Sequence, residues 1–94
     1  MKLLMIIVED SHKEEVEIFL QRAGVDGYTE IPGATGMGVT GPRLGSGAFP
    51  KTSALIFSVV DGDDVGRLKA ALLDFCAVCG EKIKMLALDA EEIL

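Results

Sequence analysis

Apolar residues run without interruption from residue 3 to residue 8, so both alternating faces of this segment would be hydrophobic in an extended strand. Such a run is typical of a central strand in a sheet that is covered on both sides. Apolar positions then recur at helical spacing until Gly24, a typical C-terminal stop. Because Ser11 and Glu14 have the spacing of a capping box, the pattern predicts a helix over residues 11–23.

The second half of the chain continues with two strands, a helix and a strand. Residues 27–31 form a short strand candidate, and residues 54–60 form a stronger one with alternating apolar positions. Carboxylates at residues 61–64 can stabilise the positive end of a second helix, which Gly80 would terminate. Residues 82–88 have the pattern of a last strand.

This order of elements predicts one α+β domain over residues 1–94, a ferredoxin-like βαββαβ sandwich with both helices on one face of the sheet. No linker or low-complexity segment divides the chain. Its hydrophobic content is 49%, and a domain of this size buries only about 60–65% of the surface of its unfolded chain. The apolar strands would leave the second sheet face bare, so we expect further copies of the chain to cover it.

A long glycine-rich loop separates the second and third predicted strands. Residues 32–51 contain six of the 11 glycines and all three prolines. Loops of more than about 12–15 residues in compact domains are usually functional or disordered. No Asp or Glu occurs between Glu30 and Asp61, whereas Arg43 and Lys51 lie in the loop. Exposed backbone amides and two cations suit an anion such as phosphate, although a merely flexible loop would have the same composition.

The candidate ligand-binding residues of this loop carry exposed amides, a hydroxyl group or a positive charge, and they are Gly33, Thr35, Gly36, Gly38, Arg43 and Lys51. Gly36, Gly38 and Gly41 also satisfy the pattern G-x-G-x-x-G. A dinucleotide-binding glycine turn opens a helix, and no helix is expected after Gly41. The loop therefore predicts an anion site of another kind.

Charge and composition argue against several classes of function. The net charge is −6 and the isoelectric point is near 4.6, so the protein as a whole repels nucleic acid and anionic lipid. The apolar N-terminal run is too short to cross a membrane, and no cleavage site follows it, so we expect a cytoplasmic protein. His12 is the only histidine and lies in the first turn of a predicted helix. We therefore expect a binding protein without catalytic residues, metal or cofactor, rather than an enzyme.

Cys76 and Cys79 form a C-x-x-C pair late in the second predicted helix. Two thiols are half of a structural zinc set. Residues three apart on a helix have Cβ atoms about 5–6 Å apart, beyond the roughly 3.5–4.5 Å that a disulfide requires. We expect reduced thiols packed in the core, with redox sensing or a metal site shared between subunits as the alternative.

Taken together, these segments resemble the P-II-like signalling family. The resemblance covers essentially the whole chain and is carried by the first strand and helix, the glycine-bearing entry to the loop at residues 31–36, the Phe49-Pro50-Lys51 step, and residues 59–64. It implies a ferredoxin-like homotrimer with a long mobile loop between its second and third strands.

The resemblance also implies where a ligand would bind. Members of the family hold nucleotides in clefts between subunits, at the base of the long loop and at a glycine- and lysine-bearing turn before the last strand. The matching positions here are Gly33, Gly36, Lys51, Gly80 and Lys82. An adenine nucleotide is the small anionic ligand that this match favours.

Two functional hypotheses follow from the sequence. The first is a trimeric regulatory protein that binds an adenine nucleotide and acts through its loop on a partner such as a membrane transporter or an enzyme. The alternative is a metal-responsive trimer that resembles the divalent-cation-tolerance proteins. Its support is His12, the methionines and the C-x-x-C pair.

Overall fold

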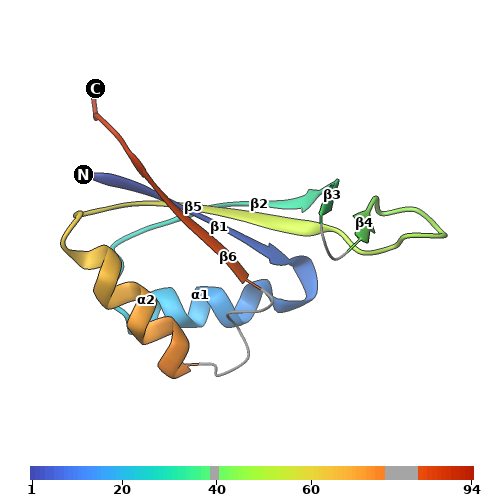
Figure 1. Cartoon of the computed structure of the whole chain (residues 1–94), viewed down its shortest axis with the longest axis horizontal. Helices are drawn as coiled ribbons and strands as arrows, with labels where there is room; N and C mark the ends of the chain where they lie inside the picture. The colour runs from blue at the N-terminus through green and yellow to red at the C-terminus, as the bar shows by residue number, and fades with distance from the viewer. Residues whose placement is uncertain (39–40, 76–82) are drawn as a thin grey trace.

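The computed structural model describes residues 1–38, 41–75 and 83–94. Four antiparallel strands form a sheet in the order β2-β5-β1-β6, and helices α1 and α2 lie together on one face of it (Figure 1). The elements are β1 (Lys2–Glu9), a 3-10 turn η1 (Asp10–His12), α1 (Lys13–Arg22), β2 (Thr29–Ala34), β3 (Gly36–Gly38), β4 (Gly41–Arg43), β5 (Ser53–Val60), α2 (Asp64–Phe75) and β6 (Ile83–Asp89). This topology confirms the predicted ferredoxin-like sandwich.

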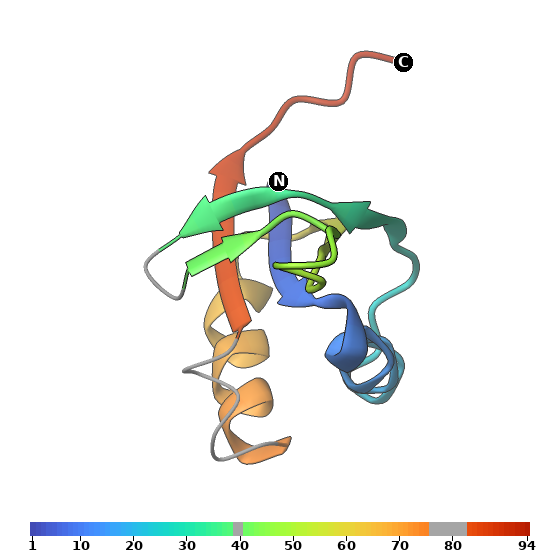
Figure 2. The same ribbon diagram turned by 90° about the vertical axis from the view of Figure 1, so that its right-hand side faces the viewer.

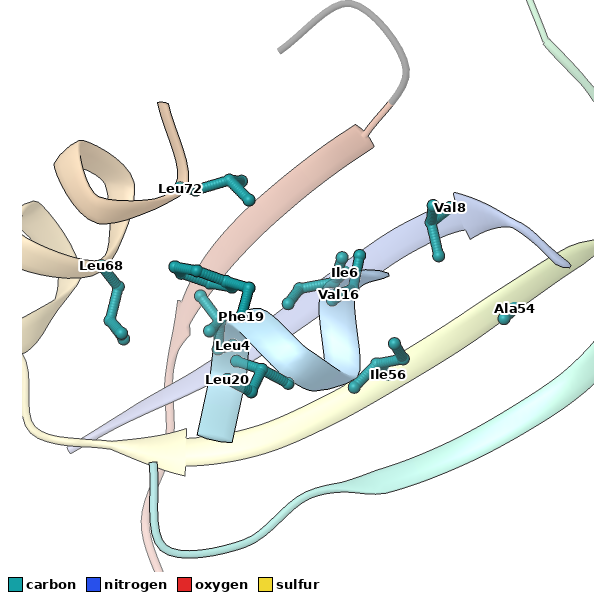
Figure 3. Close-up of a cluster of buried hydrophobic side chains, with 10 residues drawn as sticks. All are labelled: Leu4, Ile6, Val8, Val16, Phe19, Leu20, Ala54, Ile56, Leu68 and Leu72. Atoms are coloured by element: carbon teal, nitrogen blue, oxygen red, sulfur yellow. The ribbon is translucent and has the colours of Figure 1, made fainter. Parts of the chain in front are cut away.

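One face of the sheet packs on the two helices. Ile6 in β1 lies between its partners Ile56 in β5 and Met85 in β6, so the central strands share one register of inward-facing side chains. The buried core residues are Leu4, Ile6, Val8, Val16, Phe19, Leu20, Ala54, Ile56, Leu68 and Leu72 (Figure 3). Burying a large aliphatic or aromatic side chain stabilises a fold by about 1.5–3 kcal/mol, so this layer supplies much of the stability of the fold.

The first helix begins differently from the prediction. The Ser11 hydroxyl donates a hydrogen bond to Oε1 of Glu9 at 2.9 Å, and no side chain caps the first turn of α1. The predicted capping box is therefore wrong, because the chain turns through η1 before α1 starts and Ser11 lies within that turn. The predicted end is confirmed. Gly24 has a φ of 77°, and the N–H of Val25 donates to the carbonyl of Leu20 at 3.1 Å, as in a Schellman motif.

The long loop contains regular structure. β2 extends to Ala34, and its register shifts between Ile31 and Ala34, where Gly33 has a φ of 71°. Beyond it, β3 and β4 pair as a two-stranded antiparallel sheet, called here the β3–β4 ribbon. The ribbon projects past the end of the main sheet, and Figure 2 shows it from that end. Strands thus include residues 32–34, 36–38 and 41–43 of the predicted loop.

The other face of the sheet is not covered by either helix. On this face β1 presents Leu3, Met5 and Ile7. Their partners in β5 are Val59, Phe57 and Leu55, in that order, and their partners in β6 are Leu88, Leu86 and Lys84. This set, together with Ile31 of β2, is called here the open face. It is apolar apart from Lys84, and Val59 is 57% exposed. The predicted second apolar face is therefore present in the structure.

The last predicted strand is confirmed as β6. The described residues do not include Gly80, Lys82, Cys76 and Cys79. The expected ligand contacts of the first two and the expected reduced thiols of the last two therefore stay predictions. Among the described residues, no helix is long and apolar enough to cross a membrane.

Candidate functional site

The long loop leaves and rejoins the sheet beside the end of β1. Ala34, at the end of β2, pairs with Ser53, at the start of β5, and Ser53 also pairs with Glu9. The strand order therefore brings the entry and the exit of the loop next to the last residue of β1. We call this place the loop base.

Asp10 connects both ends of the loop to β1. The N–H of Gly33 donates to Oδ2 of Asp10 at 3.0 Å, and the Thr52 hydroxyl donates to the same oxygen. The N–H of Asp10 donates in turn to the carbonyl of Thr52 at 3.0 Å. The other carboxylate oxygen, Oδ1, is buried and receives no hydrogen bond from the described residues. One side chain thus fixes the loop entry and exit with only half of its acceptor capacity.

Glu9 holds the two cations of the loop. Its Oε1 accepts the hydrogen bond of Ser11, whereas Oε2 accepts a hydrogen bond from Nη1 of Arg43 at 3.2 Å and lies 3.9 Å from Nζ of Lys51. The Ser11 hydrogen bond lowers the pKa of Glu9, and Arg43 and Lys51 lower it further against the opposing effect of burial. Glu9 is therefore an anion that partly neutralises both cations.

The segment between β4 and β5 is a compact turn. The carbonyl of Phe49 accepts hydrogen bonds from the N–H groups of Leu44 and Ser46, at 3.3 and 3.0 Å. The Ser46 hydroxyl accepts the N–H of Phe49 at 3.2 Å, and the N–H of Gly45 donates to the carbonyl of Lys51 at 3.3 Å. These bonds set the spacing between the backbones of Arg43 and Lys51, so both cations reach Glu9 together.

The model of the nitrogen regulatory protein P-II family matches residues 1–89. The chain belongs to the P-II family. This confirms the resemblance drawn from the sequence and places the protein among regulatory proteins. No curated protein matches the sequence significantly.

Solved structures of similar fold include CPII, a nitrogen regulatory PII-like protein from Thiomonas intermedia K12. A CPII structure bound to ADP, AMP and bicarbonate is 28% identical, with a TM-score of 0.69 over 93% of this chain and 86% of that chain. The apo form is 26% identical, with a TM-score of 0.70 over 93% and 85%. A structure bound to ADP and bicarbonate is 29% identical, with a TM-score of 0.65 over 93% and 86%.

In this P-II protein, the predicted site residues of the loop fall into two groups. Arg43 and Lys51 meet at the loop base on Glu9. Gly36 and Gly38 lie in β3, where Gly36 pairs with Arg43. Thr35 is exposed between β2 and β3, and the N–H of Gly33 is already bound to Asp10.

The electrostatic interpretation of the loop needs correction. The sequence around Arg43 and Lys51 is free of acids, which suggested a locally cationic segment. In space, Glu9 and Asp10 at the end of β1 lie at the loop base, and Glu9 contacts both cations. The charge of an anion site here therefore depends on where the carboxylate of Glu9 lies.

Glu9, Asp10 and Thr52 are the residues that sequence reasoning missed. Adjacent carboxylates before a predicted helix usually cap it or lie in solvent, so this pair does not stand out in the sequence as part of a site. Their position directly after the first strand was the available signal, because β1 and β5 are neighbours in this fold and the loop ends at β5.

Proposed function

We propose that this P-II protein is a cytoplasmic regulatory homotrimer without enzymatic activity. It binds an adenine nucleotide between subunits at the loop base, and its loop passes the state of the site to a partner protein. The observation that carries the proposal is the similarity over nearly the whole chain to CPII, whose structures are bound to ADP, AMP and bicarbonate.

The open face supports the homotrimer. Apart from Lys84, it presents an apolar surface built from β1, β5, β6 and β2. Exposed apolar patches of this kind mark contacts between proteins, and closed symmetric homo-oligomers are the commonest arrangement. Packing of this face against other copies would also bring the loop base of one subunit next to a neighbour.

Lys51 and Arg43 support an anionic ligand. They are a lysine and an arginine directed at one point, which suits the oxygens of phosphate or of a small oxyanion such as bicarbonate. Gly80 and Lys82 are expected to add a second group of contacts from the turn before β6. The backbone from Gly33 to Gly36, which includes Thr35, is expected to approach the ligand. Gly38 lies farther along the loop.

The loop also carries apolar side chains for a partner. Met37 in the β3–β4 ribbon is 79% exposed, and Leu44 and Phe49 in the compact turn are also exposed. Burial of such side chains provides much of the energy of protein association. The partner could be a membrane transporter or an enzyme, in keeping with the resemblance to the family.

The P-II match favours this function over the metal-responsive alternative. No group of three or more His, Cys, Asp and Glu residues that could hold a metal occurs in the described part of the chain, which does not include Cys76 and Cys79. Nδ1 of His12, at the end of η1, lies 3.5 Å from Oε1 of Glu15 in the first turn of α1, as expected for a surface pair.

Calorimetric titration of the purified protein with ADP, AMP and ATP tests the proposal. We expect saturable binding of at least one nucleotide, with one site per subunit. An absence of binding up to millimolar nucleotide, with bicarbonate present or absent, would contradict the proposed function.

A further inference from the structure

The ion pairs of Glu9 assign it a second role, which rests on the proposed function. We propose that Glu9 is an internal competitor for the ligand: its carboxylate occupies the anion position between Arg43 and Lys51, and the oxyanion of the ligand replaces it there. The exchange transfers Arg43, and with it the β3–β4 ribbon, from β1 to the ligand.

The geometry resembles a bound anion. A single oxygen, Oε2 of Glu9, faces both the guanidinium of Arg43 at 3.2 Å and the ammonium of Lys51 at 3.9 Å. Guanidinium and ammonium groups bind oxygens of carboxylates and phosphates in the same way. The ligand group that competes with Glu9 is therefore an oxyanion, either a nucleotide phosphate or a small planar anion such as bicarbonate.

The exposure of these groups allows the exchange. The side chains of Glu9 and Arg43 are 21% and 26% exposed, and that of Lys51 is 65% exposed, so water and a ligand can reach the ion pairs. Partly exposed ion pairs contribute little net free energy, so displacing the Glu9 carboxylate costs a ligand anion little. The Ser11 hydroxyl binds the other oxygen of Glu9 and can keep it when Oε2 is displaced.

Asp10 makes the exchange local. It binds the backbone of Gly33 and the hydroxyl and carbonyl groups of Thr52, so the loop entry and exit stay attached to the end of β1 when Glu9 moves. Arg43, by contrast, is the last residue of β4 and pairs with Gly36 across the ribbon. Among the described contacts, the ion pair of Glu9 with Arg43 therefore ties the ribbon to the end of β1.

Limited digestion with trypsin tests the contact without any ligand. Trypsin must take the side chain of Arg43 into its own pocket to cut before Leu44, and the Glu9 carboxylate competes for that side chain. In Glu9→Gln we expect this cut to be about two- to fivefold faster, as for the loss of a partly exposed ion pair. Cleavage after Arg67 in α2 serves as the internal reference for global unfolding.

Glu14→Gln is the matched control, because it removes the same charge from an exposed position on α1. Its cleavage rate after Arg43 should equal that of the wild type. An unchanged rate in Glu9→Gln, or an equal increase in Glu14→Gln or at Arg67, would overturn the proposed contact.

Ligand affinity tests the competition, with ADP and sodium bicarbonate titrated separately and together. Glu9→Gln should bind the competing anion about two- to fivefold more tightly, and Glu14→Gln should bind it like the wild type. A gain for ADP alone identifies phosphate as the competitor, and a gain for bicarbonate alone identifies the small anion. Weaker or unchanged binding of both in Glu9→Gln would refute the competition.

The two proposals fail in different ways. If the wild type and Glu9→Gln both bind neither ADP nor bicarbonate, the proposed function and the competition are overturned together, while faster cleavage after Arg43 would still support the contact. If the wild type binds ADP but Glu9→Gln binds neither ADP nor bicarbonate more tightly, only the proposed competition by Glu9 is refuted.

Discussion

The N–H of Gly33 donates to Oδ2 of Asp10 at 3.0 Å, although the two residues are 23 positions apart in the sequence. Asp10→Ala removes this bond and that of Thr52, both of which are made to a carboxylate oxygen. We expect the free energy of unfolding to fall by about 1–3 kcal/mol.

Urea denaturation at a single protein concentration measures this loss, since the stability of an oligomer depends on concentration. Asp26→Ala, at an exposed position between α1 and β2, is the control and should stay within about 0.5 kcal/mol of the wild type. Equal stability of Asp10→Ala and Asp26→Ala would show that the Asp10 contacts add nothing.

Lys51→Ala should weaken the binding of ADP. The ammonium of Lys51 is directed at the loop base, and a charge-assisted hydrogen bond contributes about 1.5–3 kcal/mol. Calorimetry should therefore show a dissociation constant raised at least tenfold. Lys69→Ala, on the exposed side of α2, and His12→Ala should both bind like the wild type; a similar loss in either would argue that overall charge or stability causes the effect.

The open face should determine the oligomeric state. Val59→Lys places a charge in a side chain that is exposed in one chain but buried in the expected trimer, so the trimer should dissociate. Ile18→Lys makes the same change at an exposed position of α1 and should leave the mass unchanged. Light scattering measures both, and a monomeric wild type at micromolar concentration would rule out the trimer.

Glu17 and Glu30 should give a measurable pH dependence of stability. A hydrogen bond with Glu30 raises the pKa of Glu17, and the same bond lowers the pKa of Glu30, which also pairs with Lys13 at 3.2 Å. The protonated form of Glu17 is thus favoured in the folded state. Its contribution is present at low pH and is lost as the pH rises through the raised pKa.

Glu17→Gln imitates the protonated carboxyl group at every pH. The stability of this variant minus that of the wild type should therefore be larger at pH 7 than at pH 4. Thermal unfolding of both proteins at the two pH values measures this difference. A difference between the two proteins that does not change with pH would contradict the shared hydrogen bond. Glu92→Gln, in the exposed C-terminal segment, provides the comparison for a general charge effect.

The sequence predicted the fold because its periodicity is strong and local. The apolar run before Glu9 and the stop at Gly24 depend on neighbouring residues, and both appear in the structure. The start of α1 was missed because Ser11 lies in η1, where its hydroxyl donates to Glu9 and its oxygen does not cap the first turn of α1.

The loop base could be predicted only in part. Arg43 and Lys51 were identified from their charge and from the absence of nearby acids in the sequence. Their partner, Glu9, lies 34 positions before Arg43 and reaches it only through the pairing of β1 with β5. Local patterns give no information on such a contact, so a segment that is cationic in sequence is partly neutral in space.

β1 meets a different requirement at almost every position. Leu4, Ile6 and Val8 pack on the helices, the residues between them form the open face, and Glu9 with the following Asp10 holds the loop. Few side chains of β1 therefore face only solvent. In evolutionary terms, β1 should accept the fewest substitutions in the chain, and a change in it should disturb folding, assembly or regulation according to whether its position is even, odd or terminal.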